Sequence, residues 1–138
     1  MRTFLILSVA LFSLISCEKE GEFTQTNNQP LNLSMAVLLK SGQFTTTSGI
    51  SGSGNVKIYD DNNLRKLVLE NYTIENGPDL KVYLSTTNAP NTFVNLGNLN
   101  PETVFTIPNS VDLNVYKYVL IHCQQYNHLF AIAQLTTN

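Results

Sequence analysis

The sequence predicts an all-β domain, an antiparallel β-sandwich of about seven to eight short strands. Short segments in which apolar and polar residues alternate recur along the chain, a period typical of half-buried strands. Turn residues separate these segments at regular intervals, as in β-sandwiches. The chain contains 17 asparagines and 14 threonines, which suit turns and strand surfaces better than helix interiors. No segment after residue 17 has a convincing helical period, so an all-β fold is expected.

The strands can be placed individually. Alternating apolar residues between Leu31 and Leu39 indicate a first strand, with a short helix as the alternative. Turns are expected at Asp60–Asn63 and at Asn76–Pro78. The remaining strands are expected at Asn55–Tyr59, Leu64–Tyr72, Leu80–Ser85, Thr92–Leu96, Thr103–Ile107, Tyr116–Cys123 and His128–Leu135. The last two are the most apolar, which predicts central positions in the sheet.

Composition excludes several classes of protein. The chain has 138 residues, enough for one domain. Its 8 basic and 10 acidic residues give a net charge of −2, so there is no basic surface for nucleic acid. A polybasic tract for anionic lipid is also absent from the sequence. Two cysteines are too few for a disulfide scaffold.

The first residues have the pattern of an export signal. Arg2 precedes an apolar run at Phe4–Ile15, which is too short to cross a bilayer as a helix. The run ends in Leu14-Ile15-Ser16-Cys17, which resembles the lipobox of bacterial lipoproteins. This resemblance implies a signal peptide over residues 1–16 and a mature chain that begins at an acylated Cys17. The alternative is an ordinary signal peptide with a cysteine near the cleavage site.

Residues 17–38 are predicted to form the lipidated N-terminus and a tether. Phe23–Pro30 is rich in Thr, Asn and Gln and has no apolar period. Glu18–Glu22 weakly resembles the acidic export signals of some surface lipoproteins, but a solvated charge run is the preferred interpretation. We therefore expect a lipid-anchored protein of the bacterial cell envelope, on the outer membrane or cell surface rather than the inner membrane. The folded domain is expected at 39–138.

Familiar catalytic patterns are absent from the sequence. The glycines of Gly49–Gly54 precede no helix that could bind a phosphate, so a turn into a strand is expected there. Asp60 and Asp61 lack the further acidic ligands of a calcium site, and no metal site is predicted. Neither a Ser-His-Asp order nor a carboxylate pair is evident. The sequence therefore favours a redox or binding domain over an enzyme.

The candidate functional residues lie around Cys123. If Cys17 is acylated, Cys123 is the remaining thiol, and it has no partner within the chain. Strand alternation places His122 and Cys123 on opposite faces. A four-residue loop over residues 124–127 would pair Cys123 with His128, close enough for an imidazolium to favour the thiolate. The residues alone leave two alternatives: a buried, inert cysteine, or a redox or ligand thiol. For His122 and His128 the residues alone favour structural roles, on a strand surface or as a polar group of a loop.

The stretch from Leu39 to Leu135 resembles the DM-thirteen domain, a small extracellular β domain classed as electron-transferring. The matching pieces stand in order and at similar spacing. They are Ser41–Phe44, Ser53–Val56, Leu67–Tyr72, Asn76–Ser85, Leu96–Leu99, Phe105–Pro108, Tyr116–Cys123 and Phe130–Leu135.

The resemblance implies that Cys123 carries the function, either as a free redox thiol or as a thiolate ligand of a prosthetic group such as haem. Two positions depart from the family pattern. The residue before the cysteine is commonly Trp and is His122 here, and the position of His128 is usually apolar. A haem-binding role for His128 would therefore be peculiar to this chain.

Two functions follow as hypotheses. The first is a membrane-tethered redox domain that acts through Cys123 on a redox partner protein. The second is a β-sandwich binding or adhesion module in which Cys123 only packs in the core. The first requires that a partner, cofactor or thiol reagent can reach Cys123, whereas the second predicts access only on unfolding.

Overall fold

A computed structural model describes residues 30–99 and 103–138. The predicted signal peptide, Cys17 and most of the predicted tether lie outside the described residues. Within the two described ranges, no helix is long and apolar enough to cross a membrane.

The described chain is all-β and antiparallel, as the sequence predicts. The strands are β1 (Val37–Thr46), β2 (Asn55–Asp61), β3 (Leu64–Glu70), β4 (Leu80–Ser85), β5 (Phe93–Asn98), β6 (Val104–Ile107), β7 (Tyr118–Cys123), β8 (His128–Gln134) and β9 (Thr136–Thr137). Their order in space is β5-β4-β7-β8-β1-β2-β3-β6, and β9 pairs with β1. Strands β7 and β8 each have a neighbour on both sides, so their predicted interior position is confirmed.

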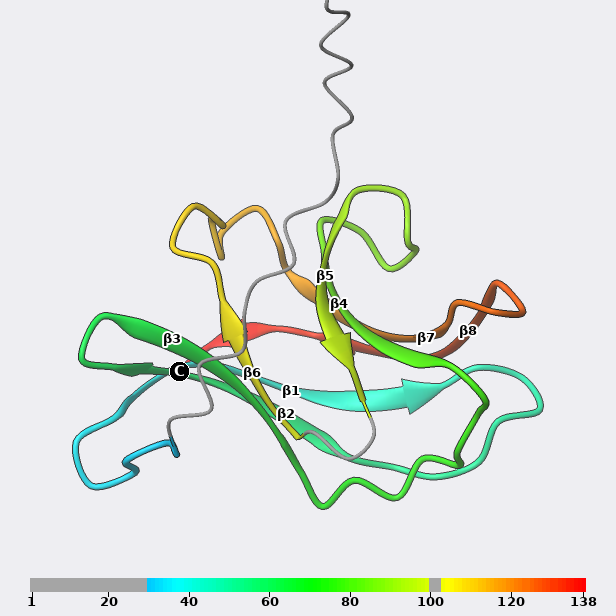
Figure 1. Cartoon of the computed structure of the whole chain (residues 1–138), viewed down its shortest axis with the longest axis horizontal. Coiled ribbons are helices and arrows are strands. Elements are labelled where there is room, and N and C mark those ends of the chain that lie inside the picture. Colours follow the sequence, from blue (N-terminus) through cyan, green and yellow to red (C-terminus); the bar gives the residue numbers. More distant parts are fainter. Residues whose placement is uncertain (1–29, 100–102) are drawn as a thin grey trace, which may run out of the picture.

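Strand β1 divides the sheet into two layers. Its first part, Val37–Gln43, pairs with β2, and its last residues, Phe44–Thr46, pair with β8. The edge strands β5 and β6 come into contact at the other side, which nearly closes the sheet on itself. The result is a curled, barrel-like sandwich whose two layers face each other (Figure 1).

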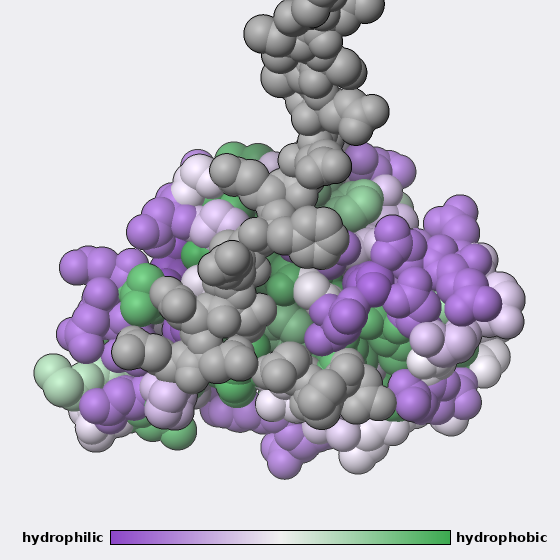
Figure 2. Space-filling view, viewed as in Figure 1, coloured by the Kyte–Doolittle hydropathy of each residue, from purple (hydrophilic) through white to green (hydrophobic). Residues whose placement is uncertain are grey.

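The core lies between these layers and draws on every strand from β1 to β8. Its fully buried large residues include Val56, Ile58, Leu67, Val82, Leu84, Phe105, Val119 and Ile121. The spacing of two along each strand is the alternation seen in the sequence. Polar side chains cover much of the visible surface of the described part (Figure 2).

The expected β2–β3 turn is confirmed in detail. Asn62 and Asn63 form the two-residue connection, and both have positive φ, at 53° and 64°. Two central residues with positive φ are typical of the type I′ hairpin, because its twist matches that of the strands, and asparagine tolerates this conformation.

The strand expected from Leu31 is wrong over its first half, because β1 begins only at Val37. The backbone N–H groups of Met35 and Ala36 both donate to the carbonyl of Asn32, at 3.1 Å, which closes a turn. β3 also ends at Glu70 rather than at the expected Tyr72. Asn71 has a φ of 50°, which turns the chain out of the sheet.

Candidate functional site

Cys123 is the last residue of β7 and points into the core. It lies directly across from Leu80 of β4 on one side and from His128 of β8 on the other. The predicted pairing of Cys123 with His128 across a four-residue loop is therefore confirmed. The thiol is free, and the residue is 0% exposed. In the folded state Cys123 thus has no surface that solvent can reach.

The loop between β7 and β8 is fixed at both ends. Asn127 has a positive φ of 48°, and its N–H donates to the carbonyl of Gln124 at 3.3 Å. The N–H of Gln124 in turn donates to the carbonyl of Asp79 at 3.0 Å, which ties the loop to the start of β4. These hydrogen bonds hold the chain directly after Cys123, where β7 ends.

His128 lies beside Cys123 in the ladder but is exposed. Its ring meets that of Phe130 edge-on, with centroids 5.3 Å apart and planes at 69°. In the pairing of β7 with β8, Ile121 lies across from Ala131 and His122 lies across from Leu129. Phe130 therefore has no partner on β7 and forms a β-bulge. This bulge turns both Phe130 and Ala131 toward the core.

The turn at Asn76–Asp79 closes the end of the core where Cys123 lies. A Cβ on Gly77 would lie only 3.0 Å from Leu80 Cδ2 and 3.0 Å from Phe130 Cζ. Leu80 is the β4 neighbour of Cys123, so this turn packs against residues that surround the thiol. Any reagent that reaches Cys123 from this end has to displace the turn or separate the strands.

His122 lies on the opposite face, as strand alternation predicts. Unlike Cys123, it is absent from the core cluster, although it is only 5% exposed. Its ring stacks on Tyr83 with centroids 5.3 Å apart, and Tyr83 stacks on Phe93 at 4.1 Å. Three rings therefore lie in series on the outer face of β5, β4 and β7, from the exposed Phe93 to the buried His122.

Burial perturbs both polar rings of this series. It lowers the pKa of His122 from 6.5, a hydrogen bond with the Asn127 side chain partly offsets this effect, and electrostatic repulsion from the nearby His128 lowers the pKa further. His122 Nδ1 is buried without a hydrogen-bond partner. Burial and the nearby Asp79 raise the pKa of Tyr83 above 10.0. Both side chains are thus held in their neutral forms at neutral pH.

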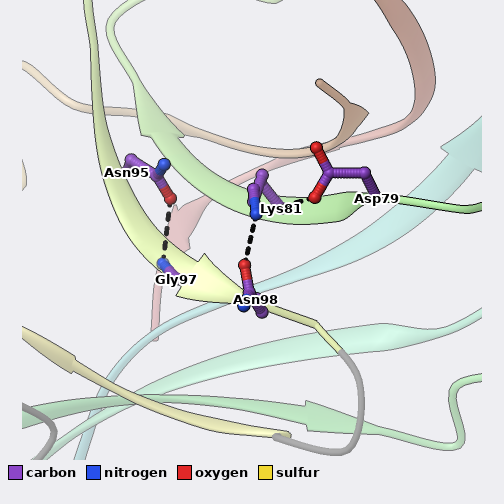
Figure 3. A network of polar contacts seen from close by, with 5 residues as sticks. All are labelled: Asp79, Lys81, Asn95, Gly97 and Asn98. Carbon is purple, nitrogen blue, oxygen red and sulfur yellow. Dashed lines mark hydrogen bonds and ion pairs between the residues drawn. The ribbon is translucent and has the colours of Figure 1, made fainter. Parts of the chain in front are cut away.

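A polar network links the start of β4 to β5 (Figure 3). Lys81 lies directly across from His122 in the ladder, and its ammonium pairs with the Asp79 carboxylate at 2.7 Å. The same ammonium donates to the side chain of Asn98 on β5. Beside it, the N–H of Gly97 donates to Asn95 Oδ1 at 3.0 Å. The pairing neutralises the lysine charge that faces His122.

A haem does not fit at Cys123 in this conformation. A thiolate ligand has to present its sulfur to an iron at the face of a flat macrocycle, whereas Cys123 has no exposed surface and packs within the core. Within the described ranges, no three His, Cys, Asp or Glu side chains converge as a metal site.

Sequence reasoning missed Tyr83, Phe93 and Lys81 as neighbours of His122. Tyr83 lies at an alternate position of a strand that was predicted with the right bounds. Its outward orientation could have been read from the alternation of Leu80, Val82 and Leu84. Its stacking on Phe93 and His122 depends on which strands flank β4, and the sequence holds no local signal for that.

Together, the fold and this site define a small antiparallel β domain with a single thiol closed inside its core. A profile of the family described as Electron transfer DM13 matches residues 43–135, about two thirds of the chain. The chain therefore belongs to the DM-thirteen electron-transfer family, as its sequence pattern indicates. No curated protein matches it, and neither does any solved structure.

Proposed function

We propose that this chain is a bacterial envelope lipoprotein, tethered through Cys17, whose DM-thirteen domain exchanges electrons through the thiol of Cys123. The observation that carries the proposal is the family match, which spans Cys123 and almost all of the described strands. Cys123 is the free cysteine of the described residues. A lipid anchor would hold the domain beside membrane-bound redox partners.

A single thiol limits the chemistry. In a two-electron exchange, the Cys123 sulfur bonds to one sulfur of a partner's disulfide, and the other partner sulfur leaves as a thiolate. The reacting group is the thiolate, so the Cys123 proton has to pass to a base first. His128 lies directly across from Cys123 in the ladder and is the candidate base.

Burial sets the condition for this chemistry. Because Cys123 is 0% exposed, a partner can reach it only when the sheet end opens. A local opening at Asn76–Asp79 would need less free energy than unfolding of the whole domain, and local openings of this kind are common at strand ends. The same burial favours the second candidate, a binding or adhesion module in which Cys123 is a structural residue.

Thiol labelling distinguishes the two candidates. The chain from Glu18 onward contains every described residue and lacks Cys17. It would be incubated with an aromatic disulfide reagent at increasing urea, and the labelling rate would be compared with the unfolding free energy. The redox proposal predicts that the native protein is labelled through a local opening whose free energy is at least about 3 kcal/mol below that of global unfolding. Labelling should then be a hundredfold or more faster than global unfolding alone would allow. Labelling that requires global unfolding would refute it and favour the binding module.

Two controls complete the experiment. The C123S variant should show no labelling at all. The absorption spectrum of each form with added haem tests the prosthetic-group alternative, since a Soret band that shifts or vanishes in C123S would identify a thiolate ligand. The anchor is tested separately by the mass of the protein purified from bacterial membranes, with C17S as the variant that cannot be acylated.

A further inference from the structure

The turn before β1 exposes an unusual concentration of large apolar side chains. Leu33 and Met35 are each 65% exposed, and Val37 is 61% exposed. Of the seven exposed large hydrophobic residues in the described ranges, these three lie within five positions. A fourth, Leu64, begins β3 at the neighbouring hairpin. We refer to Leu33, Met35 and Val37 as the N-terminal apolar surface.

This surface is held in place by hydrogen bonds. The N–H of Asn32 donates to Asp61 Oδ2 at 3.2 Å, which fastens the turn to the end of β2. Asn32 Oδ1 accepts from the N–H of Ser34 at 3.2 Å and from its hydroxyl at 2.5 Å. Val37 then lies across from Asp60 in the sheet. The apolar side chains are therefore presented outward by an ordered turn.

The location of the surface indicates what covers it. It lies where the described chain begins, and Leu33 is 16 positions after Cys17. A chain of 16 residues spans at most about 55 Å, so an anchored domain cannot move far from its bilayer. Exposed apolar side chains that gather in one part of a surface mark contact sites for proteins or membranes, and these three lie within five positions of the chain. If Cys17 is anchored, the bilayer lies within about 55 Å of the N-terminal apolar surface and is the nearest apolar environment that can cover it.

We propose that the N-terminal apolar surface rests in the interface of the bilayer and orients the domain on it, an inference that depends on the proposed anchor at Cys17. Three apolar side chains give weak binding alone, but an acyl anchor keeps them at high local concentration beside the lipid. Apolar insertion needs no basic residues, in keeping with a net charge of −2.

This orientation places the Cys123 end of the domain away from the lipid. β1 runs from Val37 to Thr46, a length of about 30 Å for ten residues. At its far end, the N–H of Thr47 donates to the carbonyl of Phe130 at 2.9 Å, beside the start of β8. The turn before β1 and the β7–β8 loop lie at opposite ends of the domain (Figure 1). The end that holds Cys123 and His128 would then face soluble or membrane-bound partners.

Tryptophan fluorescence tests the proposal directly, because the chain contains no tryptophan. L33W places the probe on the N-terminal apolar surface. Y126W is the matched control, an exposed apolar position in the β7–β8 loop at the opposite end. Both variants would be made in the full acylated protein and reconstituted in phosphatidylcholine vesicles, with and without brominated acyl chains. Equal urea midpoints would show that both variants fold.

We expect a blue shift for L33W and a loss of at least half of its emission in brominated vesicles, with Y126W unchanged. An acylated protein that floats with vesicles but shows no quenching of L33W, or equal quenching of both variants, would overturn the orientation and leave the anchor intact. A blue-shifted emission of L33W in the unacylated chain from Glu18 onward, without vesicles, would also overturn it, because another protein segment or a second copy would then cover the surface. A protein without acyl mass would refute the anchor and this inference together.

Discussion

Replacing His122 with phenylalanine should remove most of the dependence of stability on pH between pH 7.5 and 5.5. The chain has two histidines, His122 and His128. Burial lowers the pKa of His122 in the folded protein, and His128 adds to this effect. In the unfolded chain the pKa of His122 returns to about 6.5.

The direction of the pH effect follows from the lower pKa of His122 in the folded protein than in the unfolded chain. As the pH falls below about 6.5, the unfolded chain takes up the His122 proton before the folded protein does, so the free energy of unfolding decreases. The contribution of His122 is fully present above the unfolded pKa and is lost as the pH falls toward the lowered native pKa. Lys81, directly across the ladder, is already paired with Asp79 and adds no strong local field.

The magnitude has an upper limit of about 1.4 kcal/mol for each pH unit between the two pKa values. His122 is 5% exposed, but it lies on the outer face of the sheet and outside the core cluster. Solvent screening reduces the effect, and we expect a loss of about 0.5–1 kcal/mol from pH 7.5 to 5.5. Above pH 5.5 most carboxylates remain ionised and contribute little.

Urea unfolding at pH 7.5 and 5.5 measures this loss for the parent, H122F and H128N. The loss should largely disappear in H122F and persist in H128N, whose imidazole is exposed. The change between pH values is the readout, because the larger phenylalanine can shift the absolute stability by overpacking. If H122F retained the pH dependence of the parent, the assignment to His122 would be refuted.

Three further predictions concern stability measured by urea unfolding. Gly52 and Gly97 have nearly equal φ, at 122° and 125°, but a Cβ on Gly52 would lie 2.4 Å from Ile74 Cα, whereas one on Gly97 would have no atom within 4 Å. G97A should therefore lower the free energy of unfolding by about 1–2 kcal/mol through backbone strain, and G52A by about 3 kcal/mol or more. Equal losses in the two variants would contradict the close approach of Gly52 to Ile74. Y72F should lose no stability and gain up to about 1 kcal/mol, because the Tyr72 hydroxyl is buried without a partner and the edge contact with Phe44 is retained. Burial raises the pKa of Tyr72 to about 12, so the parent protein should lose stability above pH 10, and Y72F should lose less. If the parent and Y72F lost the same stability at alkaline pH, the Tyr72 hydroxyl would be solvated. C123A should cost about 1–2 kcal/mol through the cavity it leaves, and C123S about 1–3 kcal/mol through an unpaired hydroxyl, whereas losses below about 0.5 kcal/mol in both would show that the thiol is loosely packed.

The burial of Cys123 sets a structural condition for the proposed redox role of its thiol. A redox thiol at the surface would react with any small oxidant around the protein, whereas a thiol in the core is protected until the strands around it separate. The bonds from the β7–β8 loop to Asp79, and the packing of Gly77 on Leu80 and Phe130, are the contacts that such an opening has to break. A partner in the proposed redox reaction would have to open this end of the domain before it could reach the thiol.

The strands and their turns could be predicted from the sequence because their causes are local. An alternation of two residues fixes which side chains share a face, and Asn62-Asn63 supplies the positive φ of a tight hairpin. The same local rules placed His122 and Cys123 on opposite faces and put His128 across from Cys123. The alternation between Leu31 and Leu39 was misleading, because the bonds of Asn32 hold a turn there and its apolar side chains stay outside the core.

Tertiary structure alone decided whether Cys123 is reachable. Both faces of β7 are apolar, so the sequence did not reveal which face the second layer covers. That depends on how β1 passes from one layer to the other and on the neighbours of β7, all of which come from distant parts of the chain. The stack of Phe93, Tyr83 and His122 arises in the same way, from the order β5-β4-β7. Local patterns determine the direction of a side chain, but burial depends on non-local packing, which only the assembled sheet provides.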